Sequence, residues 1–256
     1  GLDRPWNGMG VSLGDVDNDG DFDLYVTNIS GEWPDGEIRY STFYRNDSTA
    51  DEQIFTDLSH AAGVDNAFWG WGTTFFDANN DGWQDLAATN GFFTDTDPSR
   101  LFLNAGGTSI SFTDSADASG FNDTDWGSGL VAFDSDRDGD LDLMQTCMEG
   151  PLRLMLNQSD DGYHWLTIRP RLLSGARPLD TKVRLTSGSM TQSRVISAGT
   201  SFMSQEPAEA HFGLGDTSTI DVLQIDWPDG TETIYRGILV DRAITLTPPV
   251  FTDSFD

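Results

Sequence analysis

Basic side chains are scarce in this sequence, and lysine is nearly absent. Only 14 Lys and Arg residues oppose 42 Asp and Glu residues, which leaves a formal net charge of −28, and Lys182 is the single lysine. A surface of this sign repels phosphate, so we expect no nucleic-acid partner. It suits a salty or calcium-rich medium outside the cell, so we expect an extracellular protein, either secreted or at the cell surface.

Long apolar runs and cysteine are scarce as well. No stretch approaches the ~20 apolar residues of a membrane-spanning helix, so we expect no membrane span. Cys147 is the only cysteine, which excludes a disulfide within the chain. Hydrophobic residues still make up 37% of the 256 residues, too many for a disordered acidic tail. A secreted protein of this composition can hold together without disulfides if bound metal supplies the cross-links.

Internal repetition is the clearest positive signal. Three segments begin with Gly and reach an Asp 14 residues later: Gly1 to Asp15, Gly63 to Asp77 and Gly120 to Asp134. The loops that start at these Asp residues lie 62 and 57 residues apart, which is the size of a propeller blade. We therefore predict three repeats within residues 1–160, at about 1–62, 63–119 and 120–160.

Short strand-like stretches between turn residues predict four strands in each of the first two repeats. Their ranges are 8–14, 22–28, 41–46 and 54–59, followed by 70–76, 84–90, 100–104 and 111–116. An asparagine closes the third strand of every repeat: Asn46, Asn104 and Asn157. Four short strands repeated about an axis are typical of a β-propeller, so we expect an all-β fold of propeller-type blades.

A different pattern begins after the third repeat and predicts a second all-β module at 161–248. Its expected strands are His164–Arg169, Thr181–Ser187, Thr191–Ser197, Asp221–Trp227, Thr231–Tyr235 and Ala243–Thr247. Residues 249–256 are a tail or a closing strand, since the Phe-Thr-Asp-Ser at 251–254 repeats that at 112–115 and could pair beside the N-terminus. Propellers generally close with four to eight blades. The C-terminal module, another copy or chain, or the rest of a longer protein could complete the ring.

Each repeat carries one loop in which positions 1, 3, 5 and 9 are Asp or Asn and position 6 is Gly. Glycine at position 6 permits the sharp turn that brings the side chains around a common centre. Position 7 includes a tryptophan, so this position should contribute its backbone carbonyl. The candidate metal ligands are Asp15, Asp17, Asp19, Asp21 and Asp23, then Asp77, Asn79, Asp81, Trp83 and Asp85, and Asp134, Asp136, Asp138, Asp140 and Asp142.

Electrostatic repulsion favours a bound cation in these loops over a solvated acidic turn. Four carboxylates about 5 Å apart repel one another by about 20 kcal/mol at an effective dielectric constant of about 20. This exceeds the ~5–15 kcal/mol stability of a typical domain. All-oxygen ligands in this number indicate Ca²⁺, about three ions in all. An EF-hand is excluded, because Val26, Ala88 and Gln145 stand where its bidentate Glu would be.

The blocks Gly14–Asp23, Phe76–Asp85 and Phe133–Asp142, each followed by a leucine, resemble FG-GAP/VCBS repeats, which build integrin-α-type propellers. The C-terminal module resembles the ASPIC/UnbV domain of cartilage-acidic-protein-like proteins, through His164-Trp165-Leu166, Ser197-Ala198-Gly199, Ser204-Gln205, His211-Phe212-Gly213-Leu214-Gly215 and Trp227-Pro228-Asp229-Gly230. The resemblance implies secreted or surface proteins with calcium in the blades, acting in adhesion, matrix contact or polysaccharide binding. It implies no catalytic residue.

Two functions therefore remain open, an extracellular calcium-dependent binding module and a propeller enzyme acting on polysaccharide or another secreted substrate. The expected partner is an extracellular protein or polysaccharide. The loops after the second strands differ in length between repeats, and variable loops usually carry binding specificity. Their aromatic residues are the candidate ligand-binding set: Trp33, Tyr40, Phe92 and Phe93. The tryptophans near the Gly-x-Gly pairs, Trp6, Trp69, Trp71 and Trp126, fit either a sugar platform or packing between blades.

Overall fold

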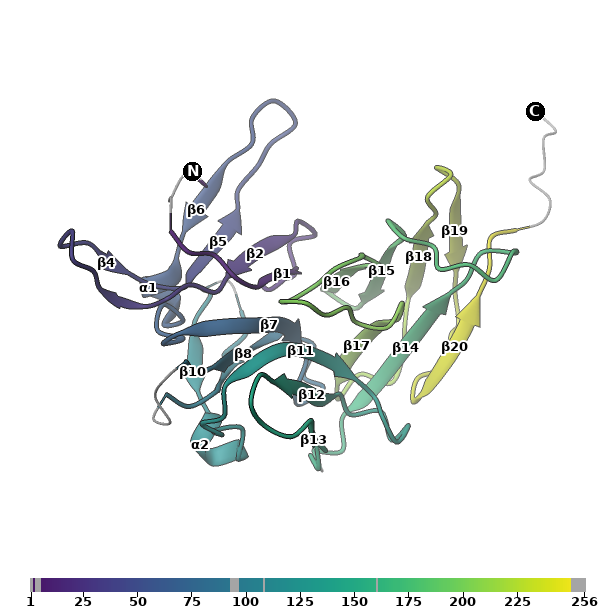
Figure 1. Ribbon diagram of the computed structural model, residues 1–256. Coiled ribbons are helices and arrows are strands. Elements are labelled where there is room, and N and C mark those ends of the chain that lie inside the picture. The colour runs from purple at the N-terminus through teal and green to yellow at the C-terminus, as the bar shows by residue number, and fades with distance from the viewer. Residues whose placement is uncertain (1, 3–5, 93–96, 108, 160, 250–256) are drawn as a thin grey trace.

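The computed structural model describes residues 2, 6–92, 97–107, 109–159 and 161–249 (Figure 1). These residues form an all-β structure with five sheets of three or four strands, one two-stranded hairpin and two one-turn helices. The five sheets have the arrangement of a five-bladed β-propeller, which confirms the predicted fold class. No helix in this described part is long and apolar enough to cross a membrane.

The three repeats form the first three sheets, whose inner strands lie side by side (Figure 1). The first sheet has the order β1-β2-β5-β6, with β1 Val11–Gly14, β2 Asp23–Val26, β5 Thr42–Asn46 and β6 Phe55–Asp57. The second contains β7 Gly70–Phe76, β8 Asp85–Asn90, β9 Arg100–Asn104 and β10 Phe112–Asp114. The third has three strands, β11 Gly127–Phe133, β12 Asp142–Cys147 and β13 Arg153–Met155. All pairs within these sheets are antiparallel.

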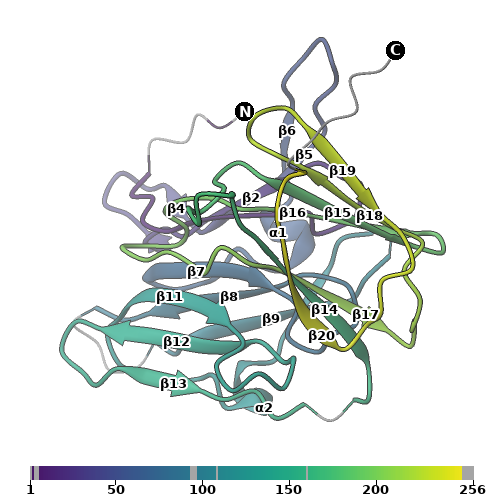
Figure 2. The ribbon, with the colours of Figure 1, turned by 90° about the vertical axis from the view of Figure 1, so that its right-hand side faces the viewer.

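The C-terminal module supplies the other two large sheets (Figure 2). One has the order β17-β14-β20, with β14 His164–Pro170, β17 Ala210–Gly215 and β20 Arg242–Leu246, and β14 pairs with β20 in parallel. The other has the order β16-β15-β18-β19, with β15 Lys182–Ser187, β16 Met190–Val195, β18 Val222–Asp226 and β19 Glu232–Tyr235. The two sheets share one hydrophobic core.

Four features differ from the sequence prediction. The hairpin β3 Gly31–Glu32 and β4 Ile38–Arg39 lies within a predicted loop, and β17 was absent from the six predicted strands. Two short helices, α1 Ser59–Ala62 and α2 Ala116–Ser119, follow β6 and β10. A four-residue helix is too short to produce a helical period in the sequence. The sequence predicts a tail or closing strand at 249–256, and of these residues only Pro249 is among those that the structure describes.

Neighbouring blades pack face to face through apolar side chains. The core between the first and second blades contains Tyr25, Phe43, Phe75 and Phe112. The core between the second and third blades is built mainly from smaller residues, among them Ala87, Leu101, Leu130 and Leu143. Burial of these faces drives the repeats together, because each blade alone would leave an apolar face in water.

One segment of the C-terminal module runs across the inner strands of all three blades. Ser201 exchanges two backbone hydrogen bonds with Val11 of β1, and its hydroxyl accepts a bond from the amide of Thr73 in β7. Ser204 donates to the carbonyl of Leu130 in β11. The module is thereby joined directly to each of the three blades.

The asparagines that close the third strands of the second and third blades also link each of these blades to the preceding one. Asn104 Nδ2 donates to the carbonyl of Gln84, in the Asp-rich loop of the same blade, at 3.1 Å. It also donates to the carbonyl of Val16, in the Asp-rich loop of the first blade, at 2.9 Å. Asn157 repeats this pattern with Leu141 and Ala78, at 3.3 and 2.7 Å. The repeated asparagine is therefore a connector between blades.

We expect Asn104→Ala to lower the free energy of unfolding by about 2–3 kcal/mol, because it leaves two buried carbonyls without a donor. Asn122→Ala is the matched control, since Asn122 is exposed and should change stability by less than about 0.5 kcal/mol. Urea unfolding of both variants with added Ca²⁺ measures the difference. Equal stability of the two variants would contradict the connecting role.

Candidate metal centres

The three candidate loops have the same backbone course, and each joins the first two strands of a blade. Position 6 has positive φ in all three loops, at 96° for Gly20, 92° for Gly82 and 102° for Gly139. Position 4 is also left-handed, with φ of 57°, 58° and 70° at Asn18, Asn80 and Arg137. In Gly139 a Cβ atom would lie 1.9 Å from the ring of Trp165, so both the turn and the contact with the C-terminal module require glycine there.

The aspartate at position 9 fastens each loop to its blade. The carboxylate of Asp85 accepts backbone hydrogen bonds from Ala78, at 2.8 Å, and from Asn104, at 2.7 Å. Asp23 and Asp142 make the matching pairs of bonds in the other blades. A carboxylate has about four lone-pair sites, so these bonds leave capacity for a metal ion.

The carboxylates at positions 1, 3 and 5 converge. In the first loop one oxygen each from Asp15, Asp17 and Asp19 lies within 4.8 Å of the others. The third loop brings together Asp134, Asp136 and Asp138 in the same way. Two ligands on opposite sides of Ca²⁺, each at 2.3–2.6 Å, are about 4.6–5.2 Å apart, so this spacing fits one shared ion.

The second loop carries an amide at position 3. Asn79 donates from Nδ2 to Asp81 Oδ2 at 3.1 Å, and its Oδ1 accepts from the amide of Asp81 at 3.2 Å. Asp77 is buried and accepts from the amide of Gly82 at 2.8 Å. The oxygen donors of this loop are thus held by hydrogen bonds within the loop.

The side chains at position 7 of the three loops have different surroundings. Asp21 is exposed, whereas Asp140 accepts a hydrogen bond from Asn80 of the second loop at 2.7 Å. The ring of Trp83 lies against Gly106, where a Cβ would come within 2.8 Å. These placements are compatible with the predicted use of the backbone carbonyl at this position.

Burial makes the loop carboxylates unfavourable as isolated charges. It raises the pKa of Asp15 to about 6, that of Asp77 to about 7 and that of Asp23 to about 8, and that of Asp85 well above the usual range. Asp17 Oδ1 is buried and has no hydrogen-bond partner. A cation in the loop would satisfy this oxygen and favour the ionised form of the whole set. The residues present therefore fit a hard divalent ion.

The C-terminal module covers the loops with polar contacts that local sequence patterns did not reveal. The amide of Ser193 donates to Asp15 Oδ2 at 3.0 Å, and His211 Nε2 lies 2.8 Å from Asn80 Oδ1. The buried Arg194 guanidinium donates to the carbonyl of His211 at 3.1 Å. The family-like motifs at 164–166 and 211–215 were the sequence signals for this interface, since they contain Trp165 and His211.

The predicted ligand-binding residues that the structure describes each pack against neighbouring side chains. Arg39 lies over the ring of Trp33 at 4.1 Å, and Tyr40 packs edge-on against Trp6 with ring centroids 4.8 Å apart. Phe92 lies between Trp69 and Trp126, at centroid distances of 4.1 and 4.7 Å. Phe93 lies outside the described residues.

Most of the tryptophans near the Gly-x-Gly pairs pack together. Trp71 lies 6.1 Å from Trp126, 6.3 Å from Phe92 and 5.1 Å from Phe202, measured between ring centroids. These rings are half-buried and fill the end of the blades opposite the metal loops. Packing between blades and module accounts for their positions, while their exposed parts form an aromatic surface at that end.

Residues 174–252 match the family described as ASPIC and UnbV. The chain thus joins β-propeller blades to a region that matches this family, which confirms the expected resemblance of the C-terminal module. It is similar to cartilage acidic protein 1. The human protein is 30% identical over 240 residues, covering 90% of this chain and 34% of that protein, and the Xenopus tropicalis protein is 27% identical over 249 residues, covering 90% and 36%. The chain spans about a third of the length of these two relatives.

Without divalent cations, we expect the free energy of unfolding to fall as the pH rises from about 4 to about 8. Asp23 and Asp77 keep their protons in the folded state up to pKa values of about 8 and 7, whereas the unfolded chain loses them near 3.8. The folded state therefore binds more protons across this window, and each such group costs about 1.4 kcal/mol per pH unit. Urea unfolding in a chelator at several pH values measures the slope. Asp23→Asn, which imitates the protonated group, should reduce the slope, and an unchanged slope would contradict the assignment.

Proposed function

We propose that this chain is part of an extracellular, calcium-binding propeller protein that makes contacts in a matrix or with polysaccharide. The observation that carries the proposal is the convergence of Asp15, Asp17 and Asp19, with a buried oxygen of Asp17 left without a partner. The same loop pattern, with Asp or Asn at positions 1, 3, 5 and 9 and Gly at position 6, occurs in all three repeats. An FG-GAP/VCBS origin of the repeats is part of this proposal.

Calcium suits these loops better than other common ions. Zn²⁺ sites in proteins use nitrogen or sulfur ligands, and the loops offer only oxygens. Mg²⁺ usually keeps several waters and takes one or two carboxylates, whereas each loop offers at least three carboxylate or amide side chains. Calcium accepts six to eight oxygens in a flexible arrangement, so it can use the side chains, the carbonyl at position 7 and water together.

The position of the loops supports a structural role for the ion. Position-9 carboxylates already hold the third strand of each blade, so an ion on the same group would stabilise the whole blade. Asp15 and Asn80 also contact the C-terminal module. An ion bound there would cross-link the chain in place of the disulfides that a single cysteine excludes.

An extracellular location is supported by the relatives and by the charge. The relatives are named cartilage acidic protein 1, and cartilage is a tissue rich in extracellular matrix. The net charge of −28 agrees with an acidic protein of this kind. The aromatic surface at the end opposite the metal loops is the face that we assign to the partner, with Trp33, Tyr40 and Phe92 on adjoining loops.

Removal of calcium should lower the melting temperature strongly, and added Ca²⁺ should restore it. Binding at 100 times Kd stabilises the folded state by about 2.7 kcal/mol per site, or about 8 kcal/mol for three sites. Asp81→Ala should remove one ion, while Asp51→Ala, at an exposed acid outside the loops, should remove none. Differential scanning calorimetry and metal analysis of both variants check these outcomes. A melting curve unchanged by exhaustive chelation would overturn the calcium proposal.

A binding module should retain its partner without converting it. We expect calcium-loaded protein to bind members of a matrix polysaccharide array and to release no new reducing ends or unsaturated products from them. Phe92→Ala should weaken this retention, while Leu239→Ala, at an exposed residue between β19 and β20 of the C-terminal module, serves as a control. Release of new chain ends would favour the alternative, a propeller enzyme.

A further inference from the structure

In the part of the chain that the structure describes, the third blade lacks the outer strand that the first two blades possess. Its sheet ends at β13, whereas β6 and β10 cover the corresponding third strands of the first and second blades. Leu156, next to β13, is 51% exposed. The equivalent residue of the second blade, Leu103, is paired with Thr113 of β10 and is half-buried. Within the described residues, the outer edge of β13 is an unpaired strand edge, which can accept another strand.

An apolar groove of about 420 Å³ lies beside this edge, between the second and third blades. The groove is lined by Leu101, Phe121, Leu143 and Met155, together with residues from the end of α2 and from the segment that follows β13. This volume falls within the range of ligand pockets, about 300–1,000 Å³.

The repeat identifies which side chain is missing from the groove. In the core between the first and second blades, Phe112 of β10 is buried with its ring 6.1 Å from that of Phe43. Around it stand Phe43, Val64, Leu86 and Phe102. Their equivalents one blade later are the four lining residues Leu101, Phe121, Leu143 and Met155. The groove is therefore the socket of a phenylalanine that the third blade does not supply.

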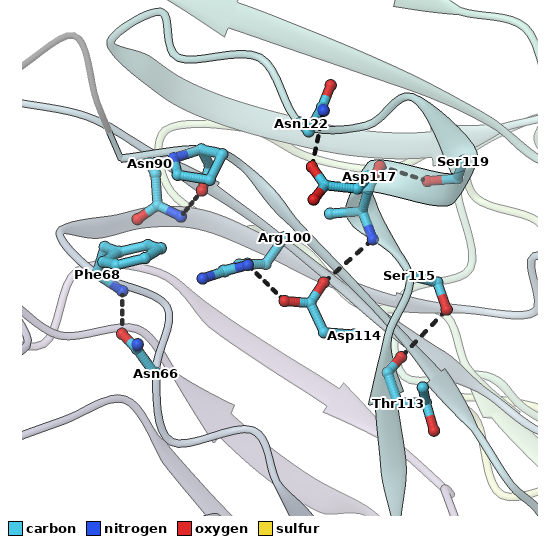
Figure 3. Close-up of polar contacts among 12 residues, drawn as sticks. Asn66, Phe68, Asn90, Arg100, Thr113, Asp114, Ser115, Asp117, Ser119 and Asn122 are labelled. Carbon is cyan, nitrogen blue, oxygen red and sulfur yellow. Dashed lines mark hydrogen bonds and ion pairs between the residues drawn. The ribbon is translucent and has the colours of Figure 1, made fainter.

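The second blade also shows how such a strand is fastened (Figure 3). Phe112 and Thr113 pair with Asn104 and Leu103 in antiparallel register. Asp114 forms an ion pair with Arg100 and accepts a hydrogen bond from the amide that begins α2 (Figure 3). The anchoring features are thus a phenylalanine, one further residue and an aspartate.

The third blade retains the cation for this arrangement. Arg153 stands four residues before Asn157, as Arg100 stands four residues before Asn104. Arg153 instead pairs with Asp125, which belongs to the segment leading into β11. It is half-exposed and can receive a second carboxylate from an added strand.

Residues 251–254 carry the required sequence. Their Phe-Thr-Asp-Ser is identical to residues 112–115, which span β10 and the residue after it. We propose that the groove beside β13 binds residues 251–254 of a second copy of this chain as an added antiparallel strand. Phe251 would fill the socket, and Asp253 would lie near Arg153.

The distances along the chain exclude the tail of the same copy. β20 is parallel to β14, with Leu246 opposite Pro170. Pro170 lies at the other end of β14 from His164, the end that follows the third blade along the chain. From Pro170 back to His164 the strand covers about 20 Å, at ~3.3 Å per residue. The five residue steps from Leu246 to Phe251 span at most about 18 Å, which is less than the length of β14 alone. A copy's own tail therefore starts too far away, whereas the tail of a second copy can reach the groove.

The test compares the chain of residues 1–256 with one that ends at Pro249, both loaded with calcium. We expect self-association of the longer chain at rising concentration in sedimentation velocity, and monomers for the shorter one. A labelled peptide of residues 249–256 should bind the shorter chain and slow hydrogen exchange of residues 153–157. If the longer chain stays monomeric at every concentration, the proposal is overturned, whether or not hydrogen exchange of residues 153–157 is slowed.

Two pairs of variants locate the binding. Phe251→Ala in the peptide should weaken binding about 10- to 100-fold, the factor that burial of one phenylalanine side chain gives, and it leaves the folded protein unaltered. Met155→Glu in the shorter chain should abolish peptide binding. Leu154→Glu is the control, because Leu154 is 50% exposed and lies outside the groove. Binding that withstands both Phe251→Ala and Met155→Glu would show that the peptide lies elsewhere and would overturn the proposal.

Discussion

A buried aspartate at the end of each inner hairpin is the interaction on which the rest of the structure depends. Asp23, Asp85 and Asp142 each hold two separate backbone segments of a blade through one carboxylate. Each is almost completely buried. A charge in such a place is favourable only when hydrogen bonds and a nearby cation compensate for its lost hydration. The fold and the proposed ion therefore depend on the same groups.

This dependence extends beyond the blades. The face of the loops that carries Asp15, Asn80 and Gly139 is covered by the C-terminal module, through Ser193, His211 and Trp165. A change in one loop is thus transmitted to residues that are distant in sequence. Binding of the proposed ion, the order of the blades and the position of the module would therefore form one linked equilibrium.

Much of the architecture could be predicted from the sequence because the repeats are regular. The predicted ranges 70–76 and 100–104 coincide with β7 and β9, since turn residues bracket both strands. Loop positions followed from fixed offsets between Asp and Gly. The contacts of the loops with the C-terminal module could not be predicted, because the residues in contact lie far apart in the sequence. Asn80 and His211 are separated by 131 residues, and Asp15 and Ser193 by 178 residues. No local period records such a pairing.

The connecting asparagines give the row of blades a direction. In both connections the later blade contributes the amide donor and the earlier blade contributes the carbonyl, as with Asn104 and Val16. Loss of an earlier blade would leave a buried N–H without an acceptor, whereas loss of a later blade would leave a carbonyl, which proteins tolerate more readily. The row is therefore more sensitive to removal of blades from its amino-terminal side, a polarity that would favour assembly in the order in which the chain is synthesised.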